Sequence, residues 1–241
     1  AIFLIPLLGA LLIALIPRNY RFVIRCVALL ATLVAATLAV KMFFAFQAGQ
    51  PGYQFEQLIP WVQSLGINWH VGVDGVNLGL VLLAAVVAFA ATCVSWEIKF
   101  HEKEFYILLL LMSGGILGAF ASLDLVFFYG FHELALVPTF LMIGVWGRGE
   151  DKNYATFKIT LYLSLGALIA LAGLIALYLQ LPMGERTFDI ERLTAYFRDH
   201  PMPGAAQQWI FPVLMFGFGI LVSLWPFHTW APLGYGSAPT A

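Results

Sequence analysis

The residues best placed to do chemistry in this sequence are ionisable residues inside long apolar stretches. Segment 124–147 is mostly apolar, yet it carries His132 and Glu133 near its middle and Pro138 five residues after Glu133. About 20 apolar residues cross a bilayer as a helix, and an acid at that depth costs a few kcal/mol of insertion free energy. We therefore expect a membrane-spanning helix with a proton or ion site at Glu133. The alternative is a protonated carboxyl that only joins two helices.

Three neighbouring features support or limit this expectation. Pro138 removes one intrahelical hydrogen bond and so weakens the helix beside Glu133. His132 can orient Glu133 or exchange a proton with it, because imidazole titrates near neutral pH. Asp124 suits the start of the helix, where an acid interacts favourably with the positive end of the helix dipole, better than it suits proton transfer.

Lys158 and His228 are the other candidates. Lys158 falls little more than one turn into the apolar segment 154–180, where a cation opposes the helix dipole. Its alternative role is to extend to the membrane surface. His228 follows Pro226, which cannot donate to the carbonyl of residue 222, so we expect a broken helix there. The alternative is a helix that simply ends at Pro226.

The composition indicates a polytopic membrane protein. Of 241 residues, 61% are hydrophobic and 10% are charged, whereas soluble domains are about 45–50% apolar and 25% charged. A net charge of −1 gives no reason to expect nucleic-acid binding. Cys26 and Cys93 lie in apolar surroundings, and the histidines have no metal-ligand spacing, so we expect no metal or redox cofactor in this chain.

The candidate residues must be positioned by several membrane spans. We expect an all-α fold in which a polar loop at 47–75 contains a short strand at 67–73, or an irregular loop there. Residues 190–197 have one apolar face, which predicts a helix lying on the membrane or docking to a partner. The glycines at 217 and 219 favour close helix packing. The predicted spans are 1–17, 26–46, 76–96, 105–121, 124–147, 154–180 and 208–226.

Basic residues predict the orientation in the membrane. With the N-terminus outside, eight lysines and arginines fall at inner loops and adjoining helix ends, against four at outer ones. Because basic residues concentrate on the inner side, this distribution favours an outer N-terminus.

Several ordered motifs resemble one family. The stretches FHELALVPTFLMIGVWG (131–147), ATFKITLYLSLG (155–166), WPFHTW (225–230), LGINWHVGVDGVNLGLVLL (65–83) and APTA (238–241) resemble the subunit M, or chain 4, family of NADH–quinone oxidoreductase, respiratory complex I. The resemblance covers essentially the whole chain. It implies a proton-translocating subunit of about fourteen helices with two inverted repeats. The present chain would then be a fragment, with three peripheral helices in 1–104, including the loop, and most of the first repeat in 105–241.

The resemblance also implies roles for residues and partners. Glu133, Lys158 and His228 match the family's proton-path residues. No cofactor is expected in this chain; NADH, FMN, iron–sulfur clusters and quinone belong to partner subunits, among them antiporter-like neighbours. The expected location is an energy-transducing membrane, the bacterial inner membrane.

One departure matters. The resemblance places a buried lysine of the seventh helix at position 221, where this chain has Leu221, and residues 199–241 contain no lysine or arginine. Lys158 becomes the best remaining partner for Glu133. Two other functions stay open: a subunit of a multisubunit cation/proton antiporter, and a membrane scaffold with a lost channel.

Overall fold

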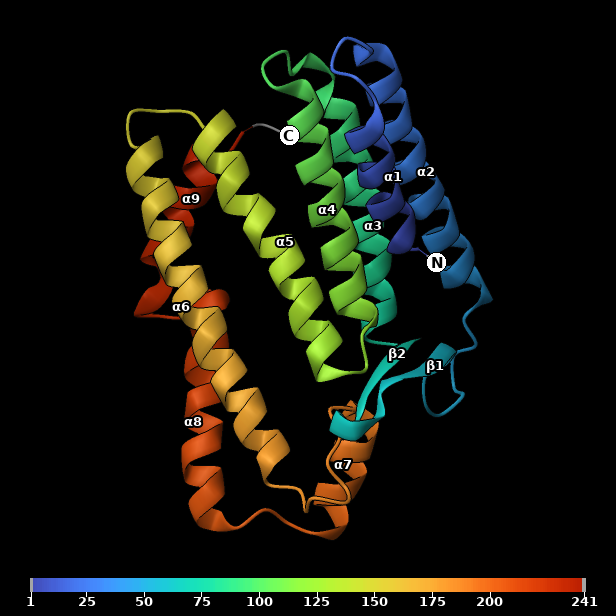
Figure 1. Cartoon of the computed structure of the whole chain (residues 1–241), viewed down its shortest axis with the longest axis vertical. Helices are drawn as coiled ribbons and strands as arrows, with labels where there is room; N and C mark the ends of the chain where they lie inside the picture. The colour runs from blue at the N-terminus through green and yellow to red at the C-terminus, as the bar shows by residue number, and fades with distance from the viewer. Residues whose placement is uncertain (1, 240–241) are drawn as a thin grey trace.

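The computed structural model describes residues 2–239, which form a helical bundle with one β-hairpin (Figure 1). Among them, six helices are long and apolar enough to cross a membrane: α2, α3, α4, α5, α6 and α8. The apolar helix α1 is shorter, at 12 residues. The elements are α1 (Leu4–Leu15), α2 (Arg21–Ala45), β1 (Gln54–Val62), β2 (Ile67–Val73), α3 (Asn77–Val94), α4 (Glu102–Ala121), α5 (Leu125–Trp146), α6 (Lys152–Leu179), α7 (Ile190–Asp199), α8 (Gly204–Leu221) and α9 (Trp230–Ser237).

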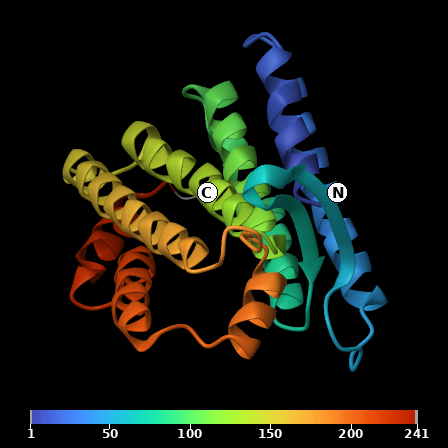
Figure 2. The ribbon, with the colours of Figure 1, turned by 60° about the horizontal axis from the view of Figure 1, so that its bottom comes forward.

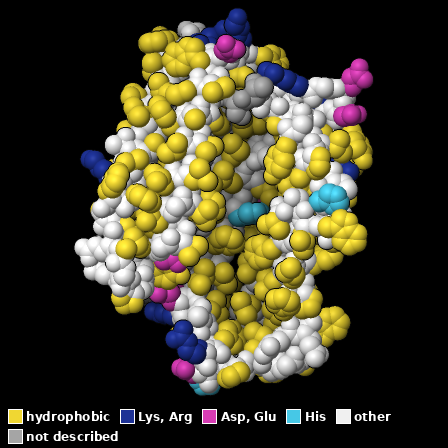
Figure 3. All heavy atoms as spheres, turned by 180° about the vertical axis from the view of Figure 1, so that it is seen from behind, with side chains coloured by type: hydrophobic (Ala, Val, Ile, Leu, Met, Phe, Trp, Pro, Cys, Tyr) yellow, Lys and Arg dark blue, Asp and Glu magenta, His cyan; other side chains and the backbone are white. Residues whose placement is uncertain are grey.

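The predicted all-α membrane fold is confirmed, with six to seven apolar helices. Figure 3 shows hydrophobic side chains over most of one face, while lysine and arginine side chains gather mainly towards its ends. Such a surface suits lipid around the middle of the bundle and water at both ends.

Helix α4 lies at the centre of the first four helices and packs against α1, α3 and α5. Two glycines of α4 let α5 approach closely. A Cβ atom on Gly115 would lie 2.7 Å from the backbone nitrogen of Ala135, and one on Gly118 would lie 2.5 Å from the ring of Phe131. Small residues at such positions bring two helix backbones together. This contact fixes the helix that carries Glu133.

Helix α6 connects α5 to the last part of the chain. It packs against α5, α8 and α9. At the α6–α8 contact, a Cβ atom on Gly217 would lie 2.5 Å from the backbone nitrogen of Ala170. The close packing predicted for Gly217 is therefore present.

The hairpin and α7 lie at the same end of the bundle (Figures 1 and 2). The predicted strand at 67–73 is β2, which pairs antiparallel with β1. The link between α4 and α5 runs between this hairpin and the segment that precedes α7. In that link, the Leu123 amide donates to the carbonyl of His70, and the Ile190 amide donates to the carbonyl of Leu123, each at 2.8 Å. The predicted helix at 190–197 corresponds to α7, whose Leu193 is buried. Contact with the membrane surface stays a prediction.

The predicted span 208–226 ends earlier than expected. Helix α8 stops at Leu221, and Ser223 adopts a positive φ of 54°, which a right-handed helix cannot contain. A 3₁₀ turn at Phe227–Thr229 then leads into α9. The alternative of a helix that simply ends is wrong, because a second helical segment follows the interruption and packs against α6 as α8 does.

Candidate functional site

Glu133 lies in the middle of α5 with its carboxylate only partly shielded. Its side chain is 32% exposed, but Oε1 is buried and has no hydrogen-bond partner within residues 2–239. Nδ1 of the neighbouring His132 lies 4.0 Å from Oε1, and the hydroxyl of Tyr129, one turn earlier on α5, interacts with the same carboxylate. A buried oxygen without a partner costs about 1–3 kcal/mol unless a proton or a water reaches it.

The start of α5 is held by Asp124. This residue is fully buried and is the N-cap of the helix: Oδ1 accepts from the amides of Val126 and Phe127 at 2.9 and 3.3 Å. Its other oxygen accepts from the amide of Asn68 at 2.9 Å. Burial raises the pKa of Asp124, although these three amides oppose the rise. The predicted place of Asp124 at the start of the helix is confirmed.

The face of α5 that carries Phe128 and His132 is turned towards α8. Phe131, about 100° further round the helix, packs into the core formed with the hairpin and α4. The ring of His132 stacks on Phe128 of its own helix, and Phe128 contacts Phe218 of α8 with ring centroids 6.2 Å apart. Pro138 is buried inside α5, one turn beyond Glu133. His132 therefore lies on the side of α5 that faces α8.

Lys158 is half-buried on α6 and faces aromatic rings of its own helix. Its Nζ atom lies 5.6 Å from the ring centroid of Tyr154 and 5.9 Å from that of Tyr162, positions four residues before and after it. Cation–π contacts of this kind stabilise a positive charge in an apolar region. Within the described part of the chain, no ion pair joins Lys158 to Glu133. The structure therefore does not bring the proposed pair into direct contact.

The interruption between α8 and α9 exposes polar groups. His228 and Thr229 are both exposed. The carbonyl of Val222, predicted to be freed, accepts a hydrogen bond from the hydroxyl of Ser223 at 2.7 Å. Trp230 crosses the interruption, because its Nε1 donates to the carbonyl of Ile220 at 3.0 Å. Trp230 thus anchors α9 to α8, and His228 lies exposed beside the interruption.

Residues 122–241 match the family model described as NADH:quinone oxidoreductase/Mrp antiporter, TM. The fold agrees: a chain of respiratory complex I from Thermus thermophilus superimposes with a TM-score of 0.81 at 30% identity, over 98% of this chain and 46% of that one. The chain belongs to the family of antiporter-like membrane subunits of NADH:quinone oxidoreductases and Mrp antiporters.

Two sequence relatives are both named subunit M, of two different dehydrogenases. The chain is 33% identical over 224 residues to NADH-quinone oxidoreductase subunit M of Rhodobacter capsulatus. This alignment covers 89% of this chain and 42% of the relative. It is 35% identical over 215 residues to F(420)H(2) dehydrogenase subunit M of Methanosarcina mazei, over 88% of this chain and 43% of the relative. The chain thus spans about two fifths of the length of these curated relatives.

Leu221 stands at the position where the family resemblance implied a buried lysine. Its side chain is partly buried and packs against an apolar cluster built by α5, α6 and α9. No charged group stands at this position. The cluster consists of Leu136, Ile143, Ile159, Leu163, Trp230 and Ala231.

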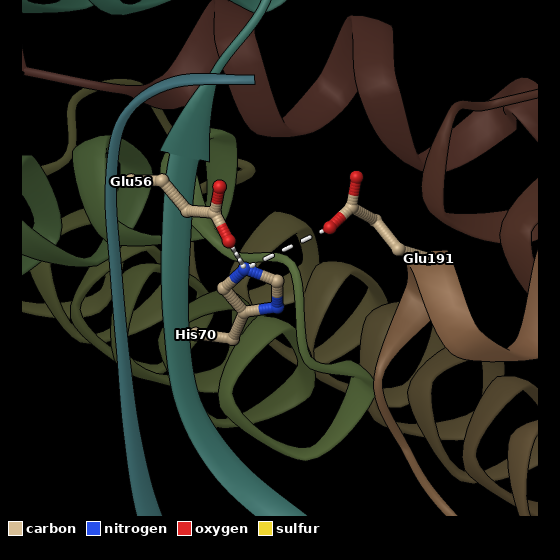
Figure 4. A group of neighbouring side chains, drawn as sticks. All are labelled: Glu56, His70 and Glu191. Carbon is tan, nitrogen blue, oxygen red and sulfur yellow. Dashed lines mark hydrogen bonds and ion pairs between the residues drawn. The ribbon is translucent and has the colours of Figure 1, made fainter. Parts of the chain in front are cut away.

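A second group of ionisable residues was missed by sequence reasoning. Glu56 of β1, His70 of β2, Asp189 before α7 and Glu191 of α7 meet at the hairpin end of the bundle (Figure 4 shows three of them). The residues come from three separate segments, so no local spacing predicts the group. The only available signal was that His70 lies in a predicted strand of a membrane protein.

Proposed function

We propose that this chain is part of a proton-translocating membrane subunit of NADH–quinone oxidoreductase. The observation that carries the proposal is the carboxylate of Glu133, which lies within an apolar spanning helix with one buried oxygen that has no partner among residues 2–239. Acids at such depth usually serve ion or proton pathways. In this proposal the subunit itself performs no redox chemistry.

The proposed chemistry is reversible protonation of Glu133. A carboxylate held away from water is costly unless a cation or donor approaches it, so small movements of charge nearby can change its protonation. His132 is close enough to share a proton through water. Lys158 supplies a movable cation on the adjacent helix, and His228 lies at the interruption after α8, where water can reach it. Waters between these groups would complete the path.

The proposal includes partners and location. Electron transfer from NADH through FMN and iron–sulfur clusters to quinone would take place in partner subunits, and neighbouring antiporter-like subunits would contact this one. The chain would lie in a bacterial inner membrane with its N-terminus outside. The names of the relatives as quinone oxidoreductase subunits support this assignment.

The test is Glu133→Gln in the complete complex. The amide has nearly the same shape but cannot exchange a proton, so we expect the rate of proton pumping coupled to NADH oxidation to fall about tenfold, equivalent to about 1.4 kcal/mol on the barrier. Glu185→Gln is the matched control, because Glu185 is an exposed acid outside the spans. Unchanged pumping rate and stoichiometry in the Glu133 variant would remove Glu133 from the mechanism.

Two specific observations favour other functions. The family model describes Mrp antiporters as well as quinone oxidoreductases, which keeps a cation/proton antiporter subunit as a second candidate. Deletion of the gene would then reduce sodium tolerance and leave NADH oxidation intact. Leu221 favours a scaffold without a channel. In a scaffold, Glu133→Gln would change neither pumping nor assembly, whereas substitutions on packed helix faces would disturb assembly.

A further inference from the structure

His70 is the centre of the group at the hairpin end. Its side chain is 2% exposed, and both ring nitrogens face carboxylates. Figure 4 shows Nε2 between Glu56 and Glu191. Nδ1 lies 2.6 Å from Oδ2 of Asp189, and Nε2 lies 2.8 Å from Oε1 of Glu56 and 3.9 Å from Oε2 of Glu191. Three carboxyl groups therefore surround one buried imidazole.

Asp189 determines which imidazole nitrogen carries a proton. It is 1% exposed, and its Oδ1 accepts from the amide of Arg192 as the N-cap of α7. The carboxylate is thus held as an acceptor, and Nδ1 of His70 must be the donor. In the neutral ring, Nε2 then has a lone pair. That lone pair faces two further carboxylates, Glu56 and Glu191, so a proton or a bound cation must lie between Nε2 and these oxygens.

Within the described residues, no lysine or arginine side chain forms an ion pair with the carboxylates of Glu56, Asp189 or Glu191. The contact is therefore completed by a proton, carried by His70 or by Glu56, or by a bound cation. The carboxylate–histidine arrangement of Asp189 and His70 is the one that orients metal-binding imidazoles, because it fixes the tautomer and makes the other nitrogen more basic. The same three segments thus present both the ligands and the group that orients one of them.

We propose that Nε2 of His70 and the carboxylates of Glu56 and Glu191 bind one divalent cation of the zinc type, with water as the fourth ligand. One ligand atom of each residue lies within 4.8 Å of the others. Tetrahedral zinc with bonds of about 2.0–2.1 Å places its ligand atoms roughly 3.3 Å apart. The distances from Nε2, 2.8 and 3.9 Å, bracket that spacing, so small side-chain rotations complete the site.

The ligand chemistry and access favour zinc over magnesium or calcium. An imidazole nitrogen suits zinc, whereas magnesium and calcium prefer oxygen ligands alone. Glu56 and Glu191 are each 44% exposed, so a cation in solution can reach them. The buried Asp189 holds the other side of the His70 ring. The bound cation would tie both strands of the hairpin to α7. The cation would lie at the outer end of the bundle. Its ligands take no part in the proposed proton path.

The test uses the full-length subunit in nanodiscs after removal of metals with a chelator. Titration with Zn²⁺ by calorimetry should give one site per chain. X-ray absorption of the loaded protein should show one imidazole nitrogen and otherwise oxygen ligands. Glu56→Gln and Glu191→Gln should each weaken binding at least about tenfold without loss of folding, because both side chains are half-exposed. Asp189→Asn, which preserves a capping oxygen, should weaken binding roughly 10–100-fold.

Glu185→Gln provides the control, since it removes an exposed acid from the same end of the molecule but outside the group, and its Zn²⁺ affinity should equal that of the wild type. The proposal is overturned if the wild type binds no stoichiometric Zn²⁺, or if Glu56→Gln and Glu191→Gln bind as tightly as the control. A doubly protonated His70 ring in nitrogen NMR spectra at neutral pH, unchanged on addition of Zn²⁺, would instead identify a histidinium that bridges Asp189 and Glu56.

Discussion

At the residue scale, two glutamates within the spanning helices show opposite behaviour. Glu102, at the start of α4, has a 4% exposed side chain and forms an ion pair with Arg25 of α2, whose guanidinium also lies over the ring of Trp96. Glu133 has no lysine or arginine partner among the described residues, and its neighbour His132 is 4.0 Å away. Glu102 therefore holds helices together, whereas Glu133 forms no such ion pair, as the proposed proton exchange requires.

This contrast predicts different costs for the same substitution. Glu102→Gln leaves the partly exposed Arg25 without its charged partner, so we expect a loss of about 1–3 kcal/mol in the free energy of unfolding. Glu133→Gln breaks no ion pair with lysine or arginine within residues 2–239, and its unfolding free energy should change by less than about 1 kcal/mol. Thermal unfolding in detergent, followed by circular dichroism, would compare them. Equal destabilisation by the two changes would show that Glu133 is a structural acid.

The sequence identified the candidate residues better than their partners. Glu133, Lys158 and His228 stand out because charged or polar groups are expensive in apolar stretches. Whether two such groups meet depends on side-chain directions and helix rotation, which a single sequence does not encode locally. Lys158 lies over aromatic rings four residues away on its own helix. Its relation to Glu133 stays a prediction.

At the element scale, close helix contacts depend on glycine. Gly217 meets the backbone of α6, but Gly219, two residues later, meets only the side chain of Leu224 at 3.4 Å and beyond. These two positions on α8 form a natural comparison, because both are helical glycines and only one faces a neighbouring backbone.

We expect Gly217→Ala to destabilise the α6–α8 contact by about 1–3 kcal/mol, since an added methyl group would overlap Ala170. Gly219→Ala should have little effect or should stabilise α8, because alanine favours helices. Unfolding free energies of both variants measure the difference. A Gly217 variant as stable as the Gly219 variant would contradict the packing described for α8.

Helices and strands were predictable from the sequence where a local pattern of apolar and polar residues is enough to define them. The spans follow from long apolar runs, α7 from its single apolar face, and β2 from its alternating residues. The end of α8 was placed too late, because the backbone leaves the helix at Ser223 and not first at Pro226. The group around His70 was not predictable, because β1, β2 and the start of α7 come together through long-range hydrogen bonds, among them those at residues 123, 188 and 190.

At the scale of the whole molecule, the chain has two different ends. One end holds the hairpin and α7 (Figure 2). At the other end, neighbouring loops are joined by an ion pair between Arg18 and Glu104 and by hydrogen bonds from Lys103 to Ala14 and from Trp146 to the Phe100 carbonyl. Most of the basic residues belong to this second end, which the basic-residue rule assigns to the inner side.

This assignment is testable by labelling single cysteines in cells. With Cys26 and Cys93 replaced by serine, Glu185→Cys near the hairpin end should react with a membrane-impermeant maleimide applied outside. Glu150→Cys, in the loop before α6, should react only after the membrane is permeabilised. Both side chains are exposed, so access to solvent is equal. The reverse pattern would place the N-terminus inside.

If Glu133 changes its protonation during turnover, infrared difference spectroscopy of the intact complex should detect it. On reduction by NADH, we expect a carboxyl band that shifts in D₂O and is absent from the Glu133→Gln variant but present in Glu185→Gln. An identical difference spectrum in the Glu133→Gln variant and the wild type would show that Glu133 keeps one protonation state.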